Sequence, residues 1–130
     1  MKIPALITIC LMLVFGSAGA NEAVTTAYIN LQPAVIGNYS ASGGKLKFYK
    51  ADIALRVKSN NVARVEYHVP LIRDQLVMQF AQQTDEDFAS VEAKEAVRRA
   101  ALMRVQSVLE REEGETLVED LLFNNLVVQK

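Results

Sequence analysis

The sequence predicts an α+β fold in which a small three-stranded sheet packs on two to three helices. Residues 27–36, 45–58 and 116–129 are rich in the branched and aromatic residues that are typical of strands. Residues 62–111 instead repeat apolar residues at spacings of three and four, as half-buried helices do. The resulting order, strand-strand-helices-strand, lets helices cover one face of the sheet. Which strands are neighbours stays open at this point.

The N-terminal residues have the composition of a secretory signal peptide. Lys2 precedes the apolar run 3–15, and Ala18-Gly19-Ala20 forms an A-x-A cleavage site. The run is short for a membrane span, which needs about 20 apolar residues. We therefore expect a signal peptide over residues 1–20 and one periplasmic domain over residues 21–130. An uncleaved anchor in the inner membrane, with the domain facing the periplasm, is the alternative.

The cysteine content follows from the same interpretation. Cys10 is the chain's single cysteine and lies in the apolar run. It would leave with the signal peptide, so we expect a domain without disulfides, stabilised by an ordinary apolar core.

The first two predicted strands form a hairpin in the simplest arrangement. Pro33 cannot donate a ladder hydrogen bond, so the first strand lies at a sheet edge or is broken there. A loop over residues 37–44 ends in Gly43-Gly44, which marks a turn into the second strand. An antiparallel hairpin is the expected result.

The second strand, residues 45–58, carries two apolar phases. Ile53, Leu55 and Val57 alternate with polar or small residues, which predicts one buried face. Leu46 and Phe48 have the opposite phase. The change of phase indicates either a β-bulge near residues 49–50 or a strand covered on both faces there.

The helical region divides at a proline. Its apolar stripe consists of Val62, Val65, Val69, Ile72, Leu76 and Phe80. Pro70 removes a backbone donor and clashes with the preceding turn, which predicts a kink or two helices that meet, the second one beginning at Leu71. Proline is well tolerated in the first turn of that second helix.

A third, longer helix is predicted over residues 91–111. Thr84 and Asp87 form a capping pattern for a short turn before it, and Ser90 is placed to cap the long helix. Gly114 is the residue type that ends helices. The buried stripe of this helix is predicted to be Val97, Ala101, Val105, Val108 and Leu109.

Charge and chemistry exclude several classes of function. The chain has 14 basic and 15 acidic residues, a net charge of −1. This balance argues against nucleic-acid binding, which needs a basic surface, and gives no support for capture by anionic lipid. No nucleophile, metal-ligand or phosphate-loop motif is present, so we expect no enzyme activity, no cofactor and no metal site.

Two groups of titratable residues have structural explanations. His68, the only histidine, adjoins the predicted kink, and we expect a structural or surface role, with a pH-sensitive or ligand-binding role as the alternative. The acidic run Asp85, Glu86 and Asp87 lies at a helix start, where capping and the helix dipole favour carboxylates.

Several separated segments resemble the FliL family of flagellar basal body-associated proteins. Tyr28-Ile29-Asn30-Leu31 followed by Pro33 resembles the family's opening strand. Residues 69–74 resemble the family's helix start, which has a proline and then Arg-Asp. Residues 84–88 and 92–96 resemble the family's next two motifs, with Ala93 in place of the usual glycine. Residues 119–129, with Leu122-Phe123 and a final Gln129, resemble its closing strand. The segments occur in the family's order.

The resemblance implies a stomatin-like periplasmic domain that is non-catalytic and assembles into rings or arcs around the flagellar stator. The implied role is support of stator recruitment, torque under load and surface sensing, and hence of motility, swarming and chemotaxis. Implied partners are further copies of the chain and stator or basal-body proteins. Family members have a basic cytoplasmic tail, a full transmembrane helix and a long linker, and this chain departs from that pattern.

Assembly would need surfaces that fix the orientation of neighbouring subunits. Four charged residues are the candidates for this contact: Arg73, Asp74, Arg98 and Arg99. The alternative function is a periplasmic carrier or adaptor that binds a small apolar ligand or an envelope lipid. Complementary exposed patches on opposite sides would favour assembly, whereas a concave apolar pocket would favour the carrier.

Overall fold

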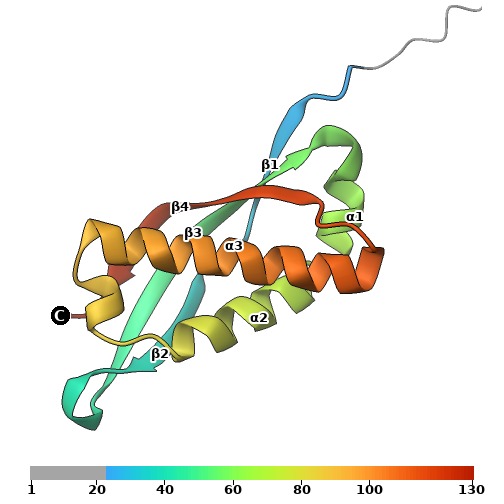
Figure 1. The fold of residues 1–130 in the computed structure, drawn as a ribbon. Helices are drawn as coiled ribbons and strands as arrows, with labels where there is room; N and C mark the ends of the chain where they lie inside the picture. The colour runs from blue at the N-terminus through green and yellow to red at the C-terminus, as the bar shows by residue number, and fades with distance from the viewer. Residues whose placement is uncertain (1–22) are drawn as a thin grey trace, which may run out of the picture.

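An antiparallel sheet covered on one face by helices forms the domain (Figure 1). The computed structural model describes residues 23–130. The strands are β1 (Thr26–Asn30), β2 (Val35–Ser40), β3 (Leu46–Lys58) and β4 (Val118–Val128). The helices are α1 (Val62–Tyr67), α2 (Val69–Ala81) and α3 (Val91–Glu113), with short 3-10 turns η1 (Ser42–Gly44), η2 (Ser59–Asn61) and η3 (Glu86–Phe88). The predicted α+β class is confirmed, with strands before and after the helices as expected, and the sheet has four strands where three were predicted.

β3 is the central strand of the sheet. β1 pairs with its second half, from Thr26 opposite Lys58, and β2 pairs with its first half. β4 pairs with both halves of β3, so β1 and β2 lie together on the opposite edge. The first predicted strand therefore forms one edge of the sheet as two separate strands, β1 and β2. They are divided around Pro33, which follows a cis peptide bond.

The bulge predicted near residues 49–50 is wrong. β3 keeps a strict alternation, and its register with β4 shifts instead at two other places, where Asn124 and Glu119 are extra residues of β4. Leu46 and Phe48 fit the same alternation as residues of the outer face, so no insertion in β3 is needed to explain them.

The inner face of β3 is the floor of the core. Its buried residues are Tyr49, Ala51, Ile53, Leu55 and Val57. α2 and α3 lie across this face (Figure 1) and contribute the buried residues Ile72, Leu76, Phe80, Val97, Ala101, Val105 and Leu109. Phe80 packs edge-on against Tyr49, and the two ring centroids lie 5.1 Å apart. Both predicted helical stripes thus face the sheet.

The joint between α1 and α2 lies at His68. α1 ends at Tyr67 and α2 begins at Val69, with Pro70 in its first turn. Ile72 donates its N–H to the carbonyl of His68 at 2.9 Å, so the helical ladder resumes directly after the proline. Two helices meet there as predicted, and the second begins two residues earlier than expected.

α3 has the ends that its sequence predicts. The N–H of Ala93 donates to Ser90 Oγ at 3.0 Å, which caps the first turn. Gly114 adopts φ 76°, a left-handed conformation that costs glycine little, and donates to Glu110 O at 2.9 Å. Before α3, Thr84 donates to Asp87 Oδ2 from both its N–H and its hydroxyl, as the capping pattern predicts.

The predicted signal peptide and Cys10 lie outside the described residues. Over residues 23–130, none of the helices combines the length and the apolar composition that crossing a membrane requires.

Candidate interaction surfaces

Two of the four candidate interaction residues are held by the domain itself. Arg98 donates to Asp120 Oδ1 at 2.6 Å and to Leu121 O at 3.0 Å, and also pairs with Glu95 one turn before it. Arg73 donates to Pro33 O at 2.5 Å and to Ala34 O at 3.5 Å. Arg98 therefore ties α3 to β4.

The other two candidates point outward. Asp74 is exposed on α2, and the side chain of Arg99 on α3 is 73% exposed, with one ion pair to Glu95 at 3.3 Å. Glu95 thus accepts from both arginines. Because of the Arg98 hydrogen bonds above all, the pKa of Glu95 falls to about 2, and the pKa of Arg98 rises further above its ordinary value.

The outer face of the sheet carries an exposed apolar patch at its hairpin end. We define the sheet patch as Ile36, Leu46, Phe48 and Val127, which are between 45% and 69% exposed. Ile36 and Val127 flank Lys50 in one rung of the sheet. Phe48 lies diagonal to both, which is within reach of cross-strand contact. These four side chains form one surface because the register brings three strands together.

The helical layer, on the opposite side of the domain, carries three exposed apolar side chains among polar ones. We define the helix patch as Met78 of α2 with Ala100 and Met103 of α3, all exposed. Ala100 and Met103 line a hollow of about 420 Å³ between the two helices. Asp74 precedes Met78 by one helical turn and Arg99 precedes Met103 by one turn, so each charge shares a face with a methionine.

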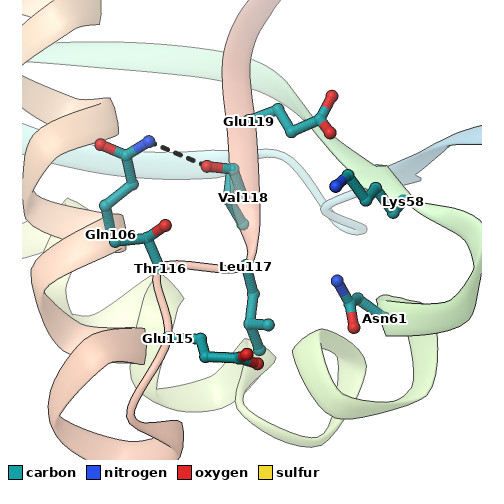
Figure 2. A pocket seen from close by; sticks show the side chains of 8 residues that line it. All are labelled: Lys58, Asn61, Gln106, Glu115, Thr116, Leu117, Val118 and Glu119. Atoms are coloured by element: carbon teal, nitrogen blue, oxygen red, sulfur yellow. Dashed lines mark hydrogen bonds between the residues drawn. The ribbon is translucent and has the colours of Figure 1, made fainter.

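A further hollow of about 320 Å³ lies where α3 ends and β4 begins (Figure 2). Leu117, in its wall, has φ 55°, and the N–H of Val118 reaches back to Thr116 O at 2.6 Å in a tight turn. The conformation is strained, and burial of the Leu117 side chain in the core offsets that strain. The amide of Gln106 donates to Val118 O at 2.9 Å, the bond drawn in Figure 2.

The two carboxylates around this hollow already have cationic partners. Glu115 accepts from Arg64 at 2.8 Å, and Glu119 lies 3.6 Å from Arg56. The hollows of the domain described here are open depressions with polar residues in their walls. Such shapes favour docking of another molecule over enclosure of an apolar ligand.

His68 is part of a structural ion cluster. Its Nε2 lies 2.9 Å from Glu113 Oε1, and Arg64 contacts the same carboxylate at 3.4 Å. These neighbours lower the pKa of Glu113, His68 contributing most. The cluster joins α1 to the end of α3. Among the described residues, no group of three potential ligands is placed to hold a metal ion.

Asp85 holds the β2–β3 hairpin against the segment before α3. It accepts from the Tyr39 hydroxyl at 3.0 Å, from Ser42 N–H at 3.1 Å and from Lys47 Nζ at 3.2 Å. The pKa of Asp85 is lowered, chiefly because of the bond from Ser42. Capping explained the acidic run in sequence terms, but it did not reveal this long-range contact.

Comparison with known families gives the classification. The model of the family described as flagellar basal body-associated protein FliL matches residues 28–129. This chain belongs to the FliL family. The expected resemblance is confirmed over nearly the whole described domain, and the protein is flagellar basal body-associated on that ground. FliL is a family of structural and accessory flagellar proteins that is not known as enzymatic. Among curated proteins, no match to this chain was found.

The structure adds residues that the sequence did not single out as a FliL interaction surface. Leu46 and Phe48 were visible as a second apolar phase on β3, and this was the available signal. Ile36 and Val127 gave no such signal, since only the pairing of β2 and β4 with β3 brings them beside Phe48.

Proposed function

We propose that this FliL protein is a non-catalytic periplasmic subunit that self-associates into a ring or arc at the flagellar motor, supports the stator, and so promotes swimming and swarming. The observation that carries the proposal is the pair of exposed apolar patches on opposite layers of one domain. Large exposed apolar surfaces on soluble domains commonly mark interaction sites.

Two different patches on opposite sides fit a head-to-tail contact. If the sheet patch of one subunit meets the helix patch of the next, each subunit keeps one patch free to continue the series, which gives a ring when the rotation closes. Phe48 is the bulkiest side chain of the sheet patch, and the hollow beside Met103 is the recess that could receive it.

Charges beside the patches would fix the orientation of the neighbours. Lys50 lies between Ile36 and Val127 in the sheet patch, and Asp74 lies one turn from Met78 in the helix patch. Opposite charges at a contact improve specificity more than affinity. Asp74 and Arg99 are the residues we assign to the contact, while Arg73 and Arg98 shape the surface beside them through their internal bonds.

The periplasmic location rests on the N-terminal pattern. Cleavage after Ala20 would release a domain beginning at Asn21. N-terminal sequencing of the protein from a periplasmic fraction tests this. Recovery only in the inner membrane, with the first residues intact, would instead establish the anchored form.

Mixing two defective variants tests the head-to-tail contact. Phe48→Glu removes the sheet patch and Met103→Glu removes the helix patch, and neither should cost more than about 0.5 kcal/mol of folding stability because both side chains are exposed. Each variant alone should be monomeric in analytical ultracentrifugation. Their mixture should form a heterodimer that grows no further, since it keeps one intact contact and loses both ends.

A matched control uses the same face of the sheet. Tyr28 is 55% exposed at the other end of that face, and Tyr28→Glu should leave assembly unchanged. In cells, Phe48→Glu should impair swarming and localisation at the flagellar base, whereas Tyr28→Glu should not. Normal motility under load in a strain that lacks the whole gene would refute the motor role, even if the purified protein assembles.

A further inference from the structure

β4 is the outer strand of the sheet, and only half of its free edge is closed. α3 covers the first half, where Gln106 donates to Val118 O at 2.9 Å and Arg98 donates to Leu121 O at 3.0 Å. Beyond Leu121, no side chain of the described residues bonds to the outer backbone of β4. An edge of this kind is a template for a further strand.

The register shows which backbone groups point away from the sheet. Gln129 donates its N–H to Phe48 O at 2.9 Å, so Gln129 faces β3. Successive residues of an antiparallel strand turn their backbone groups to alternate sides. Leu126 and Val128 therefore direct their N–H and C=O groups to the free edge, where together they offer two donors and two acceptors.

Two hollows accompany this open half of the edge. One lies between the first turns of α3 and residues 122–126, and the other lies between η3 and residues 126–130, each with a volume of about 500 Å³. Leu126 and Lys94 line both, so the two hollows form one groove along β4. An extended peptide laid on the edge would place every second side chain in this groove.

The groove combines apolar side chains with two lysines, Lys94 and Lys130, that form no ion pair with the described residues. Val91 is 81% exposed there, and Leu122 and Leu126 are partly buried beside it. The carboxylates of the groove are already paired, Asp85 with Lys47 and Glu95 with Arg98. Lys94 is exposed and makes no ion pair with any residue that the structure describes. The complementary side chain is a carboxylate between two apolar residues.

We infer that the edge of β4 from Leu126 to Val128, together with the groove beneath α3, binds an extended acidic-apolar segment of another protein by strand addition. The segment presents apolar, acidic and apolar side chains at alternate positions, with its carboxylate at Lys94. The site adjoins the sheet patch at Val127, which belongs to both, whereas the rest of the sheet patch lies on β2 and β3. Partner binding uses the backbone edge and the groove, and self-association uses the side chains of the outer face.

A designed peptide tests this site without any change to the fold. The probe is a blocked peptide of sequence Thr-Val-Thr-Asp-Thr-Val-Thr, titrated into the isotopically labelled full chain. We expect saturable shifts in the amide NMR signals of Leu126, Val128 and Lys94. A peptide with Lys in place of Asp should bind roughly fivefold more weakly or worse, since it loses an exposed ion pair and gains a repulsion. A peptide methylated at alternate backbone nitrogens should not bind.

A charge reversal on the protein completes the test. Lys94→Glu should weaken binding of the Asp peptide by roughly fivefold, whereas Lys58→Glu, an exposed lysine at the far end of β3, should leave it unchanged. The inference is overturned if no saturable shift occurs, if both lysine variants behave alike, or if the shifts fall on Ile36, Leu46 and Phe48 of the sheet patch instead. In the Phe48→Glu variant, which lacks the sheet patch contact, shifts of the Leu126 and Val128 amides that depend on protein concentration alone would show that a second copy occupies the edge, which also overturns it.

Discussion

The two faces of β3 follow the same alternation but use their apolar residues differently. On the inner face, residues from Tyr49 to Val57 are fully buried under α2 and α3. On the outer face, Leu46 and Phe48 are 69% and 46% exposed. The inner residues contribute their burial to folding, whereas the outer residues still have apolar surface to bury. The difference shows that apolar periodicity in one strand can encode a core and a contact surface together.

The largest expected effect comes from truncating one residue on each face. Leu55→Ala removes a fully buried side chain and should lower the free energy of unfolding by about 2–5 kcal/mol. Leu46→Ala, on the outer face, should change it by less than about 0.5 kcal/mol. Urea denaturation of both variants measures the contrast. Equal losses would mean that the outer face is also part of the core.

A smaller effect should follow from adding one carbon to the inner face. A Cβ at Gly37 would lie 2.5 Å from the Tyr49 hydroxyl oxygen, so Gly37→Ala forces the ring to shift and should cost about 1–3 kcal/mol. Thermal and urea unfolding of this variant give the value.

Tyr49 itself sharpens this second prediction. Its hydroxyl has no hydrogen-bond partner among the described residues, and burial raises its pKa to about 12. Tyr49→Phe should therefore be neutral or slightly stabilising, because a buried polar group without a partner is removed. Gly37→Ala should also cost less in the Tyr49→Phe background. A loss of stability in Tyr49→Phe alone would reveal a hydrogen bond to a bound water.

The smallest effect concerns pH and the contact between the hairpin and the helical layer. The pKa of Asp85 is lowered in the folded protein from its ordinary value of 3.8. Its ionised form therefore stabilises the fold above about pH 4, and this contribution disappears as pH falls through the lower folded value. Asp85→Asn should reduce stability at neutral pH and match the unchanged protein in strong acid. A constant difference from pH 7 down to pH 2 would rule out the carboxylate as its source.

Local sequence signals determined the elements and their buried stripes. Ser90 and Gly114 act on backbone groups within one helical turn, so the limits of α3 could be predicted to within two residues. Pro70 acts on its own turn, and the break beside it was equally predictable. The apolar stripes of α2 and α3 follow from spacing alone, because a helix fixes which residues share a face.

The place of β4 in the sheet was decided by tertiary structure. A long helical crossover separates β3 from β4, and the sequence left open which edge β4 would occupy. Its pairing with β3 brings Val127 beside Phe48, creates the bulges at Glu119 and Asn124, and leaves the edge at Leu126 free. None of these follows from spacing within one element, because each depends on residues far apart in the chain.

Arg98 and Arg99 show the same division in two adjacent residues. Both are charged residues on α3 with Glu95 one turn away, and sequence reasoning treated them alike. In the fold, Arg98 meets Asp120 and Leu121 of β4, whereas Arg99 stays 73% exposed. The sequence by itself determined that both lie on a helix. Only the packing of α3 against β4 decided which one stabilises the domain and which one is available to a neighbour, because a helix turns by about 100° between successive residues.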